Sequence, residues 1–132
     1  MAETLVIGSD LKEVRQVERR LLREVADHGY SDSACFAIRL AVEEALNNAA
    51  KHGNGLDPNK SITVSYEVDE KSVRITITDE GGGFDPHAIP DPTADENLEK
   101  PCGRGIMLMK AYMDEVEFGD GGNRVRMVKD RE

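Results

Sequence analysis

The chain has 132 residues, of which 39% are hydrophobic and 33% are charged, so its size and composition fit one globular domain with a single core. Its formal net charge of −9 disfavours direct binding to nucleic acid, and an anionic ligand must instead be held by local features. No apolar run approaches the ~20 residues of a membrane span, and the first residues lack the features of a signal sequence. We therefore expect a single cytoplasmic domain over 1–132 that contacts neither membrane nor nucleic acid.

The first elements predicted along the chain are a strand and a helix. Residues 4–7 form a short apolar run, which indicates a strand at a sheet edge. Apolar residues then recur at helical spacing through 11–25, and Gly29 is placed to end this helix. Asp10 or the serine before it can cap the start of the helix, and Glu13 is expected to complete a capping box from Asp10.

A second helix is predicted from Ser31 or Asp32 to about His52, where a glycine-rich turn stops it. Its apolar residues fall on one broad stripe: Ala34, Cys35, Ile38, Ala41, Val42, Ala45, Leu46 and Ala49. Phe36 and Leu40 lie off this stripe and are expected to pack on the first helix. Cys35, on this stripe, is expected to be a small residue of the core. The other cysteine, Cys102, is far from it in sequence, and this spacing excludes a zinc site and disfavours a disulfide.

Two Glu–Asn pairs in this helix share a spacing of four residues, so the members of each pair point the same way. Glu44 and Asn48 fall at the edge of the apolar stripe, whereas Glu43 and Asn47 fall on the opposite, wet side. The first pair can therefore line a cleft beside the core, where a carboxylate and a carboxamide oxygen would serve a hydrated cation and a nucleophile. Taken alone, such a pair is more often solvated surface, so its meaning depends on the motifs in the later part of the chain.

Two strands with alternating apolar residues come next, over 62–68 and 73–77, joined by a short turn. The second strand ends in Asp79, and Gly81 and Gly83 come soon after. A carboxylate at this point can accept a hydrogen bond from the exocyclic amine of adenine, and the glycines let the backbone approach a planar base. Guanine presents a carbonyl there, which the carboxylate would disfavour. The same residues also make a good turn, so this signal alone is weak.

A long segment without periodicity, 84–102, holds four of the five prolines and is expected to be a lid. Gly103, Arg104 and Gly105 come directly after it and open a third predicted helix through 106–113. Glycines at a helix start are consistent with simple flexibility. They also leave backbone N–H groups and the helix dipole free to bind phosphate, to which the arginine would add a forked cation.

Two last strands are predicted, one starting at 116–118 and one over 124–129, with a glycine-rich turn between them. The order of elements is strand, helix, helix, strand, strand, lid, helix, strand, strand. This order predicts an α+β fold, a two-layer sandwich in which helices cover one face of a mixed, mostly antiparallel sheet.

Three separated boxes stand in the chain in this order: Glu44-x-x-x-Asn48, Asp79-x-Gly81-x-Gly83 and, after the lid, Gly103-x-Gly105. Together they resemble the Bergerat-type ATP-binding fold, the histidine kinase-like ATPase domain shared by gyrase, heat-shock chaperones, histidine kinases and mismatch-repair ATPases. Within this superfamily, the short length and the stretches AVEEALNNAAKHGN and GRGIMLMKAYMDEVEF look like the bacterial anti-sigma factor serine-protein kinases. The resemblance covers essentially the whole chain.

The resemblance implies a role for each matching residue. Glu44 matches the general base that takes the proton from the attacking hydroxyl. Asn48 matches the side chain that ligates Mg²⁺. Asp79 matches the carboxylate that recognises adenine. The glycines match nucleotide contacts, beneath the base for Gly81 and Gly83 and at the phosphates for Gly103 and Gly105, where Arg104 is expected to add its cation.

Two further positions match the superfamily less closely. His52 stands in the first box, where it is expected either to contact phosphate or to face the carbonyl groups of its own helix. Gly122 and Asn123 stand where many relatives of the superfamily carry Gly-Thr, so the hydroxyl contact near the adenine is not expected here, and Asn123 could offer an amide instead.

The resemblance implies an ATP- and Mg²⁺-dependent anti-sigma regulatory factor with protein-serine kinase activity. Such a protein would bind a sigma factor in one state, phosphorylate a serine of an anti-sigma antagonist in the other, and act as a homodimer. One alternative is a partner-switching module that sequesters a regulator without phosphotransfer. Another is a detached histidine-kinase-type ATPase domain. Glu44 argues against this alternative, because histidine kinases commonly carry Asn four residues before the magnesium ligand.

Overall fold

A computed structural model describes residues 2–53, 57, 59–80, 109–119 and 124–131 of the chain. The elements come in this order: β1 (Ala2–Gly8), α1 (Leu11–Asp27), α2 (Asp32–Asn47), η1 (Asn48–Gly53), β2 (Ser61–Val68), β3 (Ser72–Asp79), β4 (Glu115–Gly119) and β5 (Arg124–Asp130). Residues 109–112 are also helical, which agrees with the described part of the third predicted helix. The predicted lid over 84–102 and the glycines on both sides of it lie outside the described residues.

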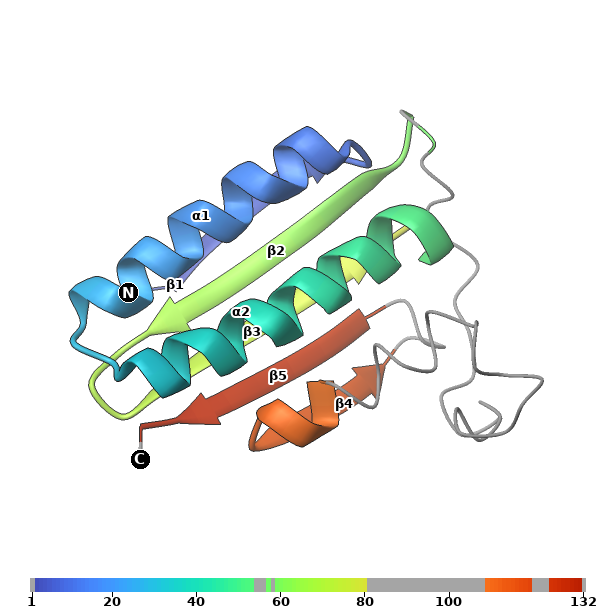
Figure 1. Cartoon of the computed structure of the whole chain (residues 1–132). Helices are drawn as coiled ribbons and strands as arrows, with labels where there is room; N and C mark the ends of the chain where they lie inside the picture. The colour runs from blue at the N-terminus through green and yellow to red at the C-terminus, as the bar shows by residue number, and fades with distance from the viewer. Residues whose placement is uncertain (1, 54–56, 58, 81–108, 120–123, 132) are drawn as a thin grey trace.

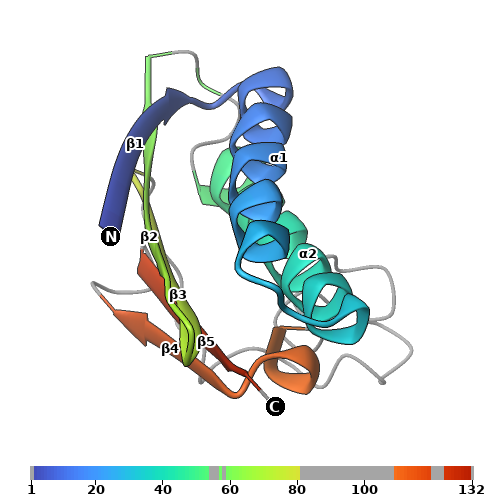
Figure 2. The same cartoon turned by 90° about the vertical axis from the view of Figure 1, so that its left-hand side faces the viewer.

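The five strands form one sheet in the order β1-β2-β3-β5-β4, with β1 at an edge as predicted. Each pairing between described strands is antiparallel, so the parallel component of the expected mixed sheet is not found among them. Helix α1 lies over β1 and β2, and α2 with η1 lies over β3 and β5, all on one face of the sheet (Figures 1 and 2). The prediction of a two-layer α+β fold is confirmed. Within the described ranges, no helix has the length and apolar character that crossing a bilayer requires.

The core lies between the helices and the sheet, where side chains from each layer meet. On α1, Val14, Val17, Leu21 and Val25 are buried at helical spacing. Along β2, burial alternates strictly, as expected for a strand that buries one face. The buried residues of β2 are Ile62, Val64, Tyr66 and Val68. The helix-facing side of the sheet is therefore apolar along most of its length.

The start of α1 departs in one detail from the predicted capping box. Asp10 is the N-cap, and its side chain accepts a hydrogen bond of 2.8 Å from the N–H of Lys12. The carboxylate of Glu13, however, accepts from the N–H of Gly8, at 3.2 Å, rather than from that of the cap residue. The strand β1 ends at Gly8, so this carboxylate joins the strand end to the helix. At the other end of α1, Gly29 has φ of +78°, which confirms it as the glycine that ends the helix.

The second helix is capped by Ser31, whose side chain accepts from the N–H of Ala34. It does not continue as an α-helix to its end, because the last six residues, Asn48–Gly53, form the π-helix η1. In this wider turn the consecutive Ala49 and Ala50 are both buried, at 5% and 0% exposure. Short π-helical segments occur often at functional sites, and this one begins at a predicted site residue.

Phe36 does not pack on α1, so that prediction was wrong. Its side chain is 54% exposed and meets the ring of Tyr112 edge-on, with 6.2 Å between the ring centroids. The side of α2 that carries Phe36 faces the helical segment 109–112 instead of α1. Cys35 is half-buried at the margin of the core and is a free cysteine. Among the described residues, no three histidine, cysteine or acidic side chains gather as a metal site would require.

The turn between β2 and β3 is held by the side chain of Asp69. Its Oδ1 accepts hydrogen bonds from the N–H groups of Lys71 and Ser72, at 2.7 and 2.9 Å, and its Oδ2 accepts from Arg74. The N–H groups of Ser72 and Lys71 hold the pKa of Asp69 below its ordinary value of 3.8. A carboxyl group whose pKa is lower in the folded chain stabilises the fold above its unfolded pKa, and this contribution is lost as the pH falls through its folded pKa.

We therefore expect Asp69→Asn to lower the urea midpoint of unfolding at neutral pH, and the difference from the unmodified protein to shrink as the pH falls below 3.8. Denaturant titrations at a series of pH values measure both midpoints. Glu70→Gln, which changes an exposed side chain of the same turn, serves as the control and should not alter the pH dependence. A difference between Asp69→Asn and the unmodified protein that stays constant over this pH range would contradict the explanation.

Candidate functional site

The predicted site residues Glu44, Asn48 and Asp79 come from two parts of the chain that end at the same end of the molecule. Glu44 lies in the last turn of α2, and Asn48 is the first residue of η1. Asp79 is the last residue of β3. Because η1 packs against β3, the segment that begins with Asn48 and the strand that ends with Asp79 meet at this end (Figure 1).

The strand pattern determines the side of the sheet on which Asp79 lies. Ile75 and Ile77 are buried on the helix-facing side of β3, and Asp79 continues them with the same two-residue period. Its partner across the ladder is Ile62, which is also fully buried on this side. The half-buried carboxylate of Asp79 therefore closes an apolar row and faces the helix layer. The adenine contact expected of this carboxylate stays a prediction.

Asn48 carries a polar group that needs a partner. Its Nδ2 atom is enclosed and has no hydrogen-bond partner among the described residues, although the residue as a whole is half-buried. A buried amide group without a partner costs about 1–3 kcal/mol, so its position needs a reason. An acceptor oxygen of a ligand would satisfy the amide as it stands. Since the two ends of a carboxamide are assigned by their surroundings, the rotated amide would present its oxygen to a cation.

The neighbouring Glu43 does not simply face water, as the helical pattern predicted. It is half-buried, and its charge lies close enough to Glu18 on α1 to affect it. Burial, and after it the repulsion from Glu43, raise the pKa of Glu18. The helical pattern of α2 could not predict this interaction, because it takes no account of α1, which packs beside α2. Glu43 is thus turned toward α1. This direction distinguishes Glu43 from Glu44 more clearly than the exposure of the two side chains does.

Two further hydrogen bonds fix the backbone near the end of β3, and no sequence motif predicted either of them. The carboxylate of Glu80 accepts from the N–H of Ser61, the first residue of β2. The hydroxyl of Ser9, a buried polar group, donates to the carbonyl oxygen of Lys60 at 2.9 Å. For His52 the structure describes the backbone, within η1, but not the side chain. The predicted nucleotide contacts at Gly81, Gly83, Gly103, Arg104 and Gly105 lie outside the described residues and stay predictions.

Comparison with known proteins gives a consistent result. The family model of the histidine kinase-like ATPase domain matches residues 7–129. The serine-protein kinase RsbW of Bacillus licheniformis is 34% identical over 110 residues, which cover 76% of this chain and 68% of the relative. The anti-sigma F factor of Geobacillus thermodenitrificans is 37% identical over 82 residues, which cover 60% of this chain and 56% of the relative.

Among solved structures, the RsbU and RsbW domains of Rv1364c from Mycobacterium tuberculosis align with a TM-score of 0.67 at 18% identity. The alignment covers 100% of this chain but only 32% of that protein, so it shows a shared fold with about a third of a longer chain. The family model spans nearly the whole sequence, and the fold agrees with it. The chain belongs to the histidine kinase-like ATPase domain family, and within it is similar to the serine-protein kinases RsbW and the anti-sigma F factor.

Proposed function

We propose that the protein is an anti-sigma factor that uses Mg²⁺·ATP to phosphorylate a serine of a protein antagonist. The observation that carries this proposal is the meeting of two elements at one end of the molecule. There β3 ends in a carboxylate on its helix-facing side, and η1 begins with an asparagine whose amide nitrogen has no partner in the part of the chain that the structure describes. The names of the relatives, serine-protein kinase RsbW and anti-sigma F factor, support the same assignment.

Each residue of the site then has a defined role. Asp79 would accept a hydrogen bond from the exocyclic amine of adenine, and this selects ATP over GTP. Asn48 would hold Mg²⁺ through its carboxamide oxygen, a ligand type that suits this hard cation. Glu44 would accept the proton of the attacking serine hydroxyl. The bound metal supplies charge stabilisation for the transferred phosphoryl group.

The remaining nucleotide contacts in this proposal come from the glycine boxes of the sequence. Gly81 and Gly83 would let the backbone approach the base. Gly103 and Gly105 would present N–H groups to the phosphates, and Arg104 would add a cation. The segment 84–102 would then serve as the lid over the nucleotide.

The partners that we propose are a sigma factor, bound in one state, and a protein antagonist that carries the substrate serine. Both occur with ATP in the cytoplasm, where we place the activity. We also propose a homodimer. No described helix covers the sheet face opposite α1 and α2 (Figure 2), and Val6 on that face is 66% exposed, so a second copy has a free surface to cover. Sedimentation equilibrium of the full chain measures this association.

Incubation of the full chain with γ-labelled ATP, Mg²⁺ and a candidate antagonist tests the kinase activity. We expect the label to be transferred to a serine of the antagonist, and not to appear when the antagonist lacks this serine. Nucleotide binding without any transfer would contradict the kinase and favour a module that sequesters its regulator and uses ATP only to set its shape.

Asp79→Asn should lower the preference for ATP over GTP by about tenfold, because an amide no longer favours the amine of adenine over the carbonyl of guanine. Calorimetric titration of each nucleotide measures the two affinities. Asp27→Asn, an exposed position at the C-terminal end of α1, is the control for the loss of one negative charge. Equal affinities for ATP and GTP in the unmodified protein would rule out adenine recognition by this carboxylate.

A further inference from the structure

Three strand ends meet beside the proposed nucleotide site. β1 ends at Gly8 and β3 ends at Asp79, while β2 begins between them at Ser61. The ladder between β2 and β3 has its last pair at Ile62 and Asp79. One step beyond this pair, the side chain of Glu80 accepts a hydrogen bond from the N–H of Ser61. A side chain thus ties the two strands together just after the regular ladder stops.

The tie matters because Glu80 stands directly before three consecutive glycines, the residues with the greatest backbone freedom. Asp79 is the last residue held by the ladder, and strand ends open more easily than strand centres. A carboxylate that accepts an N–H bond is a charge-assisted acceptor and is stronger than a neutral one. The bond from Glu80 therefore limits the motion of the backbone on the far side of Asp79.

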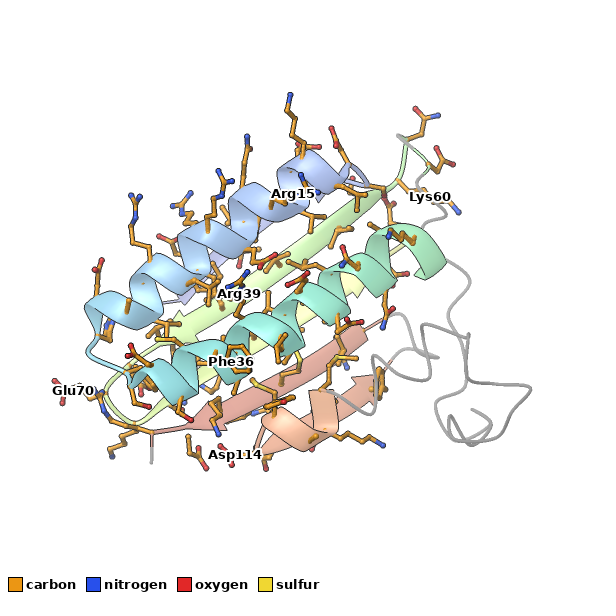
Figure 3. All side chains as sticks on the ribbon, in the orientation of Figure 1. Arg15, Phe36, Arg39, Lys60, Glu70 and Asp114 are labelled. Atoms are coloured by element: carbon orange, nitrogen blue, oxygen red, sulfur yellow. The ribbon has the colours of Figure 1, made fainter. Side chains whose placement is uncertain are left out.

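Ser61, which donates this hydrogen bond, lies in a segment that is itself held by a second hydrogen bond. Ser9 lies at the junction of β1 and α1 and is only 5% exposed, and its hydroxyl donates to the carbonyl oxygen of Lys60. The segment 60–61 is therefore held from one side by Ser9 and from the other by Glu80. Lys60 lies at the same end of the molecule as η1, which begins with Asn48 (Figure 3). Glu80 thus ties the end of β3 to a fixed point at the end of the molecule where η1, with the proposed metal ligand, also lies.

We propose that Glu80 is a positioning residue for nucleotide recognition, which holds the end of β3 so that the carboxylate of Asp79 stays directed at the adenine amine. This inference rests on the proposed function, because it assigns Glu80 a role only if Asp79 recognises adenine. The residue does not touch the nucleotide in this proposal. It acts on the affinity by reducing the number of orientations that Asp79 must give up when ATP binds.

Three variants test the proposal: Glu80→Ala removes the acceptor, Glu80→Gln keeps an acceptor oxygen at the same distance along the side chain, and Glu70→Ala is a control. Glu70 is also an exposed glutamate beside a β3 terminus, but it lies at the opposite end of the sheet (Figure 3). Calorimetry gives the affinities for ATP and GTP. Amide hydrogen exchange of Ser61 reports on the bond itself, and urea unfolding reports on global stability.

We expect Glu80→Ala to weaken ATP binding by about threefold to tenfold, with little change for GTP, and to speed exchange at Ser61. Glu80→Gln should restore most of the preference for ATP, because its carboxamide oxygen accepts the same bond. Glu70→Ala should match the unmodified protein. A purely structural role would lower the urea midpoint of Glu80→Ala without changing the ratio of the two affinities, and this result would overturn the proposal.

Other outcomes separate this inference from the proposed function. If the unmodified protein binds ATP and GTP equally, adenine recognition by Asp79 fails and the inference fails with it. If Asp79→Asn loses the preference while Glu80→Ala keeps it, the proposed function stands and only the positioning role is wrong. If Glu80→Gln keeps slow exchange at Ser61 but loses the preference for ATP as fully as Glu80→Ala, the bond to Ser61 does not set the preference, and this too overturns a positioning role through Ser61.

Discussion

Replacing Glu44 with glutamine should slow phosphoryl transfer to a serine substrate by about 10²–10⁴-fold, the usual contribution of a general base. Glutamine has nearly the same shape but cannot take up the proton of the attacking hydroxyl. Because the proposed function gives Glu44 no part in holding the adenine or the metal, the affinity for ATP should change by no more than about twofold. Single-turnover transfer and calorimetric titration measure the two quantities separately.

Glu43→Gln is a matched control for this experiment. It makes the same chemical change on the adjacent residue of α2, but Glu43 is turned toward Glu18 on α1. Transfer by Glu43→Gln should therefore remain close to that of the unmodified protein. Equal losses in the two variants would mean that the carboxylate at position 44 has no special role, and the assignment of the general base would have to be given up.

The largest effect on stability is expected for Leu21→Ala. Leu21 is fully buried between α1 and the sheet, at 0% exposure, so its truncation removes apolar contacts and leaves a cavity. Substitutions of this kind lower the free energy of unfolding by about 3–5 kcal/mol. Urea unfolding measures the change, and the dependence of stability on urea concentration should stay the same if the folded state keeps its compactness.

The neighbouring Leu22 provides the control, because Leu22→Ala makes an identical change at a half-buried position of the same helix. Both variants gain the same helix propensity, so the difference between them reports on burial alone. We expect Leu22→Ala to cost less than half as much as Leu21→Ala. Comparable losses at the two positions would contradict the placement of the core under this face of α1.

The sequence predicted strands and helix faces best. Each of these features depends on a periodic pattern of apolar residues, and residues close together in the chain determine that pattern. The alternation through Ile62 and Val64 confirmed the buried face of β2. The same alternation in β3 places Asp79 on the helix-facing side. The order of the elements predicted the two-layer fold, although it did not predict that every described pairing would be antiparallel.

The features that the sequence did not predict depend on contacts between distant segments. The carboxylate of Glu13 accepts from the N–H of Gly8 because the end of the preceding strand lies beside the helix. The capping pattern of the sequence gives no information on the direction of that strand. Phe36 meets Tyr112, which is far away in sequence. The tie between Glu80 and Ser61 likewise joins two strands, so no local motif marks it. At the site itself, η1, which begins at Asn48, packs against β3, which ends at Asp79, while the roles of these residues and the glycine contacts remain predictions.

The π-helix had no sequence signal either, since consecutive alanines suit both helix types. Its presence has a consequence for how related sequences are aligned. A π-turn closes a hydrogen-bonded ring that is one residue larger than that of an α-turn, so η1 corresponds to an α-helix with one residue inserted. Deleting Ala49 or Ala50 would close the wide turn to an ordinary α-turn, so the helix would continue as an α-helix and the residues behind the deletion would keep about the direction that they have in η1. A gap of one residue in this segment of an alignment is therefore the expected mark of a relative that lacks the π-turn, and the side chains behind the gap keep their direction.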